Sequence, residues 1–168
     1  MSGLVRNLLT LLNALFMRGR AGVQSKIQCD FWITPFDCGT RKLKSDKYLQ
    51  LAEAAELDFL VKSKLIDKLL KSGTSFVNVA QQVKFIKPIG MFRRVKVETA
   101  IICIDERFAY FSHTLILRDQ RHAEIWVKMK FKNNSRTVSP AEITGLTISP
   151  KPRYLELWDE TLEAISIA

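Results

Sequence analysis

The chain has few cysteines and histidines, the residues that form disulfide bonds in small proteins and bind metal ions. It contains three cysteines, Cys29, Cys38 and Cys103, and two histidines, His113 and His122, among 168 residues. An odd number of cysteines without a C-x-x-C pair argues against a disulfide framework and is typical of a reducing compartment. A cytoplasmic location is therefore expected. The histidine spacing matches no zinc motif, so we expect neither a metal ion nor a cofactor.

Long hydrophobic runs are also missing, since crossing a bilayer needs roughly 20 apolar residues. The first apolar segment is short and has helical spacing, with Leu4, Leu8, Leu11, Leu12, Leu15 and Phe16 recurring between arginines. A cleaved signal peptide is not expected, because the small-residue site Gly19-Arg20-Ala21 is crowded by arginine. Residues 1–22 are predicted to form an amphipathic arm that packs on its own domain or on a partner subunit. A helix in a membrane interface is the main alternative, and a signal anchor is the third.

Acidic residues are outnumbered, with 17 Asp and Glu against 26 Lys and Arg, which gives a net charge of +9. Such a surface attracts polyanions, including nucleic acids, anionic lipids and nucleotide phosphates. No aromatic RNA-binding pattern accompanies the charge, and the lone G-x-x-G, Gly19 to Gly22, trails the arm, so no nucleic-acid partner is expected. Apolar residues make up 47% of the chain, and we find no internal repeat or low-complexity segment. Residues 23–168 therefore read as one globular domain.

The first half of this domain predicts a strand followed by a long helix. From Lys26 to Ile33 apolar and polar residues alternate, which indicates a half-buried strand that Pro35 ends. A helix follows from near Asp46, with Ser45 or Asp46 as its N-cap. Its predicted inward stripe consists of Tyr48, Leu51, Ala52, Ala55 and Phe59.

A short helix from Lys64 to Lys71, closed by Gly73, precedes a change to a period near two. The predicted strands are Ser75 to Phe85, Phe92 to Cys103, Arg107 to Leu117 and Ala123 to Phe131. Short connections predict that these four form an antiparallel meander. Val95, Val97, Thr99, Ile101 and Cys103 are expected on one face of the second strand. The segment from Pro152 onward, with Leu155, Leu157, Trp158, Leu162 and Ile165, predicts a terminal amphipathic helix. The fold class is α+β, with one long helix against one sheet.

This order of elements, with the strand ending Val83-Lys84-Phe85-Ile86-Lys87-Pro88, resembles the hot-dog fold. More narrowly, it is similar to the 4-hydroxybenzoyl-CoA thioesterase-like acyl-CoA thioesterases. Their loop reads Asp, three residues, His, one residue, Asn-Asn, two residues, Tyr, before a helix with Glu and Arg. This chain keeps Tyr48, Leu49 and Glu53. It has Cys38, Lys42, Lys44, Ser45 and Glu56 where the family has Asp, His, the two Asn and Arg, and only a one-residue slip brings Asp37 into the catalytic place.

The resemblance implies an acyl-CoA thioesterase, which hydrolyses a thioester to free acid and CoA. This chemistry needs a carboxylate and donors for the developing oxyanion. Asp37 is the candidate base or nucleophile, and the alternative is a turn-forming acid. The donors would be helix-start amides around Ser45, Asp46 and Lys47. Glu53 is a second candidate carboxylate, with an exposed helix acid as its alternative.

Substrate contacts are predicted from the same loop and from a basic cluster. Cys38 lies among Arg41, Lys42 and Lys44, which would favour a thiolate, but without a histidine nearby in the sequence it is expected to be an ordinary loop cysteine. Tyr48 is expected to be a core or dimer-contact aromatic beside the substrate. The candidate contacts for CoA phosphates are Lys84, Lys87, Arg93, Arg94 and Lys96, against a solvated polar face.

Hot-dog domains pair their sheets, so the resemblance also implies a homodimer or a dimer of dimers. The substrate would be carried by CoA or by an acyl-carrier protein. A noncatalytic protein that binds acyl-CoA or an acyl carrier is the alternative function, because the His and Asn-Asn of the motif are missing.

Overall fold

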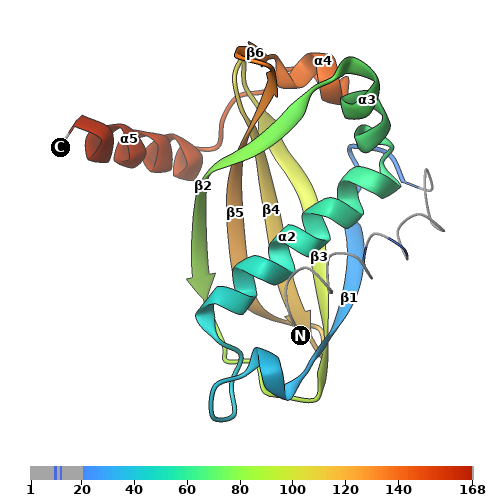
Figure 1. Ribbon diagram of the computed structural model, residues 1–168. Helices are drawn as coiled ribbons and strands as arrows, with labels where there is room; N and C mark the ends of the chain where they lie inside the picture. Colours follow the sequence, from blue (N-terminus) through green and yellow to red (C-terminus); the bar gives the residue numbers. More distant parts are fainter. Residues whose placement is uncertain (1–9, 11, 13–20, 168) are drawn as a thin grey trace.

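One long helix lies across one face of an antiparallel sheet (Figure 1). In this computed structural model the described residues are 10, 12 and 21–167. The helix is α2 (Ser45–Lys62), and it follows β1 (Ile27–Ile33) and a short turn η1 (Pro35–Asp37). The other main strands are β2 (Ser75–Phe85), β3 (Arg93–Ile104), β4 (Ala109–Leu117) and β5 (Gln120–Asn133). Most of the predicted arm, residues 1–22, lies outside the described residues.

The strand order is β1-β3-β4-β5-β2, which corrects the predicted four-strand meander. Only β3, β4 and β5 form a meander, while β2 pairs with β5 at the far edge. The two kinds of connection explain the difference. Arg118 and Asp119, both with positive φ, make a tight turn between β4 and β5. The link between β2 and β3 instead crosses the lower end of the sheet in Figure 1. Within this link Ile89 is fully buried, and its carbonyl accepts the Leu43 amide at 2.8 Å.

The predicted inward stripe of α2 is confirmed, since Tyr48, Leu51, Ala52, Ala55 and Phe59 are all buried. Phe59 meets Phe111 of β4 edge to face, with 5.6 Å between ring centroids. The small alanines allow the helix backbone to lie close to the sheet. The N-cap prediction is wrong: Lys44 takes that position without a side-chain cap, and Ser45 is already helical.

The ends of the domain are closed by smaller elements. α3 (Leu65–Ser72) ends at Gly73, whose φ of 62° favours glycine, as predicted. The sequence did not predict β6 (Arg136–Val138), which pairs with β5, or α4 (Pro140–Thr144), which contacts α3. In the described part of the chain, no helix is both long and apolar enough to cross a membrane.

The predicted terminal helix, α5 (Arg153–Ile167), packs on the outer face of the sheet only through its first turns and then extends past the edge of the sheet (Figure 1). Leu155 packs there with Cys103 and Tyr110, and the Trp158 ring lies edge-on to that of Tyr110. Cys103 was expected on the inner face with Val95. A bulge between Ile101 and Cys103 shifts the register and turns Cys103 outward, so that expectation is wrong.

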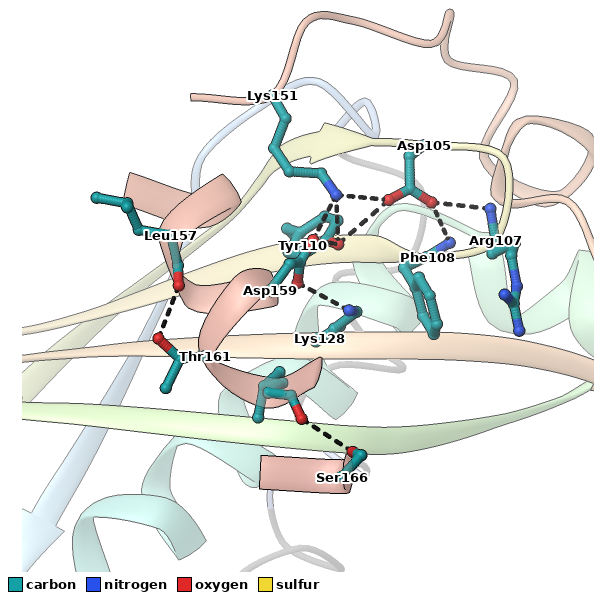
Figure 2. Close-up of polar contacts among 11 residues, drawn as sticks. Asp105, Arg107, Phe108, Tyr110, Lys128, Lys151, Leu157, Asp159, Thr161 and Ser166 are labelled. Carbon is teal, nitrogen blue, oxygen red and sulfur yellow. Dashed lines mark hydrogen bonds and ion pairs between the residues drawn. The ribbon is translucent and has the colours of Figure 1, made fainter. Parts of the chain in front are cut away.

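A polar network fixes α5 to the sheet (Figure 2). The Tyr110 hydroxyl donates to Asp159 Oδ2 at 2.6 Å, and Lys128 Nζ donates to Asp159 Oδ1 at 2.7 Å. Lys151 Nζ donates to Asp159, to Asp105 and to the Tyr110 oxygen. Burial, reinforced by Asp159, raises the pKa of Tyr110. Burial opposes the charge of Lys151, but its hydrogen bonds to the two aspartates raise its pKa overall, so both groups stay protonated and serve a structural role.

Candidate functional site

A cavity opens where α2 begins, at the lower end of the sheet in Figure 1. Its volume is about 330 Å³, and its walls come from the loop before α2, the first turn of α2 and the end of β2. The residues that matter to its chemistry are Lys42, Ser45, Tyr48, Phe85, Ile86 and Lys87. The fold therefore brings Lys87 to the predicted site residues Ser45 and Tyr48, although Lys87 lies far from both in the sequence.

Two backbone amides at the start of α2 have no hydrogen-bond acceptor in the described part of the chain. The amide of Lys44 donates to the Asp37 carbonyl at 3.1 Å, and that of Lys47 donates to the Lys44 carbonyl at 3.0 Å. No described residue accepts a hydrogen bond from the amides of Ser45 or Asp46. These amides lie at the positive end of the helix dipole, so they can stabilise negative charge on a bound group.

Tyr48 forms part of the apolar wall of this cavity. It is buried, and its ring meets Phe85 edge to face at a centroid distance of 5.0 Å. Burial raises the pKa of its hydroxyl, so the group stays neutral at physiological pH. At the rim, Lys87 Nζ donates to Gln120 Oε1 at 2.8 Å. The cavity thus combines an apolar wall with basic residues at its mouth.

Asp37, the last residue of η1, does not line this cavity. Its side chain is fully buried, and its Oδ2 accepts the backbone amide of Thr34 at 2.9 Å and the Thr34 hydroxyl at 2.7 Å. This reciprocal arrangement closes the short helix η1. Asp37 is nevertheless tied to the start of α2, because its carbonyl accepts the Lys44 amide.

The other predicted loop and helix residues are separated. Cys38 is buried, and burial raises the pKa of its thiol, which favours the ordinary loop cysteine over a thiolate. Glu53 lies on the exposed side of α2. Asp46 is exposed next to Lys47, whose Nζ donates to Gln50 Oε1 at 2.9 Å. The cavity is lined by none of the four predicted residues Cys38, Asp46, Lys47 and Glu53.

The predicted phosphate contacts do not form one cluster, because β2 and β3 are separated by β4 and β5. Lys84 and Lys96 therefore lie far apart across the sheet, and Arg94 pairs with Asp30 at 3.0 Å. Arg93 instead lines a second cavity of about 420 Å³, together with Arg118 and His122. Pro88 borders both cavities, so they are neighbours. Sequence reasoning treated Arg118 only as part of a turn and missed its place here.

A family model described as the thioesterase-like superfamily matches residues 41–145, more than half of the chain. The chain belongs to this superfamily. No curated protein sequence matches it significantly. The matched region runs from the loop before α2 through α4, so it contains both cavities.

Solved structures share the fold at low sequence identity. YbaW, a probable thioesterase from Escherichia coli, is 14% identical, with 69% of this chain and 90% of that chain covered at a TM-score of 0.65. SAV2348 from Staphylococcus aureus, solved in complex with CoA, is 10% identical, with 80% and 94% covered at 0.61. The DHNA-CoA thioesterase from Staphylococcus aureus is 15% identical, with 84% and 91% covered at 0.60. The predicted hot-dog fold is confirmed.

A second polar cluster is sealed between α2 and the sheet, away from the cavities. Asn78 Nδ2 donates to both carboxyl oxygens of Glu56 at 3.3 Å, and Glu56 Oε2 lies 3.8 Å from His113 Nε2. The other ring nitrogen, His113 Nδ1, is hydrogen-bonded to the Thr99 hydroxyl at 2.9 Å. Sequence reasoning placed Glu56 only at the Arg position of the family motif. Its position one turn after Ala52 and three residues before Phe59 could have shown that it faces inward.

Proposed function

We propose that this protein hydrolyses acyl thioesters of CoA at the start of α2. The supporting observation is that the amides of Ser45 and Asp46 have no acceptor among the described residues where the cavity opens. In the reaction, water adds to the thioester carbonyl carbon, the carbonyl oxygen becomes an oxyanion, and the C–S bond then breaks. The products are a carboxylic acid and the CoA thiol. Uncapped amides in a fixed position are the donors that such an oxyanion needs.

Asp37 is the proposed general base or nucleophile. Its backbone is hydrogen-bonded to Lys44, directly before the two amides, and Thr34 holds one carboxyl oxygen in place. A carboxylate that takes a proton from water must come within hydrogen-bond reach of that water. In this proposal the loop from Pro35 to Lys44 adjusts when substrate binds, and Asp37 then faces the thioester.

The neighbouring cavity is the proposed site for the CoA phosphates. Arg93 and Arg118 lie on its walls, and guanidinium groups bind phosphate through paired hydrogen bonds. The pantetheine arm would then run past Pro88 to the apolar cavity beside Tyr48. The net charge of +9 supports a polyanionic substrate. Cytoplasmic residence is part of the proposal and is supported by the free cysteines Cys29, Cys38 and Cys103.

The proposed assembly is a homodimer joined through β2. This strand is eleven residues long and lies at the edge of the sheet, with Val77 and Val79 exposed on it. No described strand pairs with the outer edge of β2, and unpaired strand edges bind other chains readily, which supports a partner strand at this edge. Pairing of two β2 strands would place the two cavities beside the partner subunit.

A noncatalytic acyl-CoA binder is the second candidate. It is favoured by the position of Asp37, whose carboxylate is hydrogen-bonded within the loop rather than on the cavity wall. Purified protein should be assayed against short-, medium- and long-chain acyl-CoA, with release of the free thiol as the readout and calorimetric binding of CoA in parallel.

If the protein is the proposed enzyme, Asp37→Asn should abolish hydrolysis. Asp46→Asn should leave hydrolysis intact. Binding without turnover would support the noncatalytic alternative. If neither binding nor turnover occurs with any chain length, both functions fail.

A further inference from the structure

Three large aromatic side chains project into solvent at one end of the molecule. Trp32 is 64% exposed, Phe36 is 80% exposed and Phe92 is 66% exposed. They are neighbours in the fold, because the Phe92 amide donates to the Ile33 carbonyl at 2.8 Å and Phe36 follows three residues after Ile33. We call Trp32, Phe36 and Phe92 the aromatic tip. It lies where β1 ends and β3 begins, at the lower end in Figure 1.

The backbone holds Phe92 in this position at a cost. Its φ is 57°, in the left-handed region that bulky residues rarely adopt. Burial of the side chain does not offset this strain, because the Phe92 ring is largely exposed. Exposed aromatics grouped in this way mark a contact surface rather than a general feature of protein exteriors.

Basic residues surround the aromatic tip. Arg41, Lys42 and Arg93 are exposed, and in the described part of the chain no acidic side chain forms an ion pair with them. Arg94, which is paired in register with Trp32, is partly neutralised by Asp30. The end of the molecule therefore presents aromatic rings within a field of positive charge.

We propose that the aromatic tip docks on the surface of an anionic lipid bilayer. Tryptophan and phenylalanine prefer the level of the lipid headgroups, where a ring is only partly dehydrated. Unpaired arginine and lysine at the same level are attracted to anionic lipids. A bilayer fits better than a folded protein partner, because the tip projects outward and the charges named beside it that have no ion-pair partner among the described residues are all basic.

Docking in this orientation would bring the cavity at the start of α2 to the membrane surface, since both lie at the same end of the molecule (Figure 1). Phe85 and Ile86, which line that cavity, are also exposed there. Long acyl chains partition into bilayers, so a thioester could enter from the lipid phase. The docking itself does not depend on the proposed hydrolysis, and each can fail without the other.

The first test is co-sedimentation of the full chain with vesicles of phosphatidylcholine alone or with 30% phosphatidylserine (roughly the anionic fraction needed for a strong surface potential). Binding is expected only with phosphatidylserine and should weaken in high salt.

The triple variant Trp32→Thr, Phe36→Gln, Phe92→Asn should bind about tenfold more weakly, because it loses its apolar contacts with the bilayer. Threonine suits the strand, and asparagine tolerates a positive φ. Leu70→Gln, an exposed apolar residue on α3, is the matched control and should bind like the wild type.

Equal binding by the triple variant and the wild type would overturn the proposal and assign any binding to another segment, including residues 1–22. A wild type that does not bind vesicles would also overturn it. If the triple variant then had a smaller assembly by light scattering, the tip would be a protein interface instead.

The second test locates Trp32 directly. With brominated lipids in the anionic vesicles, the tryptophan emission of the wild type should be quenched and shifted to the blue. Trp32→Phe keeps an aromatic ring at the tip, so it should still bind while most of the quenching disappears. Quenching that persists in Trp32→Phe would mean that Trp126 or Trp158 approaches the bilayer, which contradicts the proposed orientation.

Discussion

The Oε2 atom of Glu56 lies 3.8 Å from Nε2 of His113, and both side chains are sealed between α2 and the sheet. Burial raises the pKa of Glu56 to about 8 and lowers the pKa of His113 to about 3. Both groups are therefore neutral near pH 6, with a proton on the acid and none added to the imidazole. Asn78 and Thr99 supply the hydrogen bonds that a neutral pair can still make.

This pair should shape the dependence of stability on pH. Glu56 has a raised pKa, so its contribution is complete below its ordinary value of 4.5 and is lost as the pH rises through about 8. His113 has a lowered pKa, so its contribution is complete above 6.5 and is lost as the pH falls toward about 3. Between those ordinary values the two slopes cancel. Urea unfolding across this range should show a plateau between about pH 4.5 and 6.5, with decline on both sides.

Replacing Glu56 with glutamine should remove the alkaline decline. The amide keeps the shape of a protonated acid and can still bond to Asn78, but it cannot ionise. The stability difference between the variant and the wild type should grow between about pH 4.5 and 8, by up to about 1.4 kcal/mol for each pH unit, because His113 is present in both proteins. Glu53→Gln, on the exposed side of the same helix, is the control and should leave the slope unchanged. An unchanged slope in Glu56→Gln would show that Glu56 is ionised in the folded protein.

Ser45→Pro tests the amide at the start of α2 without disturbing the helix. Ser45 is the first helical residue and Lys44 before it is extended, which are the conditions that proline tolerates. Proline has no N–H, so the variant removes one proposed oxyanion donor and should lower kcat by about 10²–10³-fold. Ser45→Ala keeps the amide and should retain most of the activity. Equal rates for the two variants would remove this amide from the mechanism.

Tyr110→Phe should loosen α5. The tyrosine hydroxyl links Asp159 on the helix to Asp105 and Lys151, and all three would lose that shared partner. We expect a loss of about 1–3 kcal/mol in the free energy of unfolding and faster proteolytic cleavage after residue 150. Tyr154→Phe is the control, because among the described residues the Tyr154 hydroxyl has no hydrogen bond. Intact α5 in Tyr110→Phe would show that Leu155 and Trp158 hold the helix by apolar packing alone.

Ala52→Leu should strain the contact between α2 and the sheet. The alanine is fully buried, and its small side chain lets the helix lie close to the sheet. Overpacking at such a site costs about 1–3 kcal/mol, which thermal unfolding would detect. Glu53→Leu, the next residue along the helix, places the same side chain on the exposed side and should change stability far less.

Periodicity in the amino-acid sequence was sufficient to predict the local elements. The alternation in β1, the inward stripe of α2 from Tyr48 to Phe59 and the glycine that closes α3 all follow from rules that act within a few residues. Together with the motif around Tyr48, they also predicted the hot-dog fold that the comparisons confirm. The uncapped amides at the start of α2 were predicted in the same way, although the residue at the cap was not.

Tertiary structure alone decided which of these elements meet. Nothing in the spacing of β2 and β3 showed that β2 would lie beside β5, so the predicted phosphate cluster separates into Lys84 on one edge and Arg93 at the other cavity. The contact of Glu56 with His113 joins residues on α2 and β4, and the network of Asp159 joins α5 to β5. A pattern along the chain reports the direction of a side chain relative to its own element. Its partners depend on strand order, bulges and packing between distant segments, which become defined only when the whole core forms.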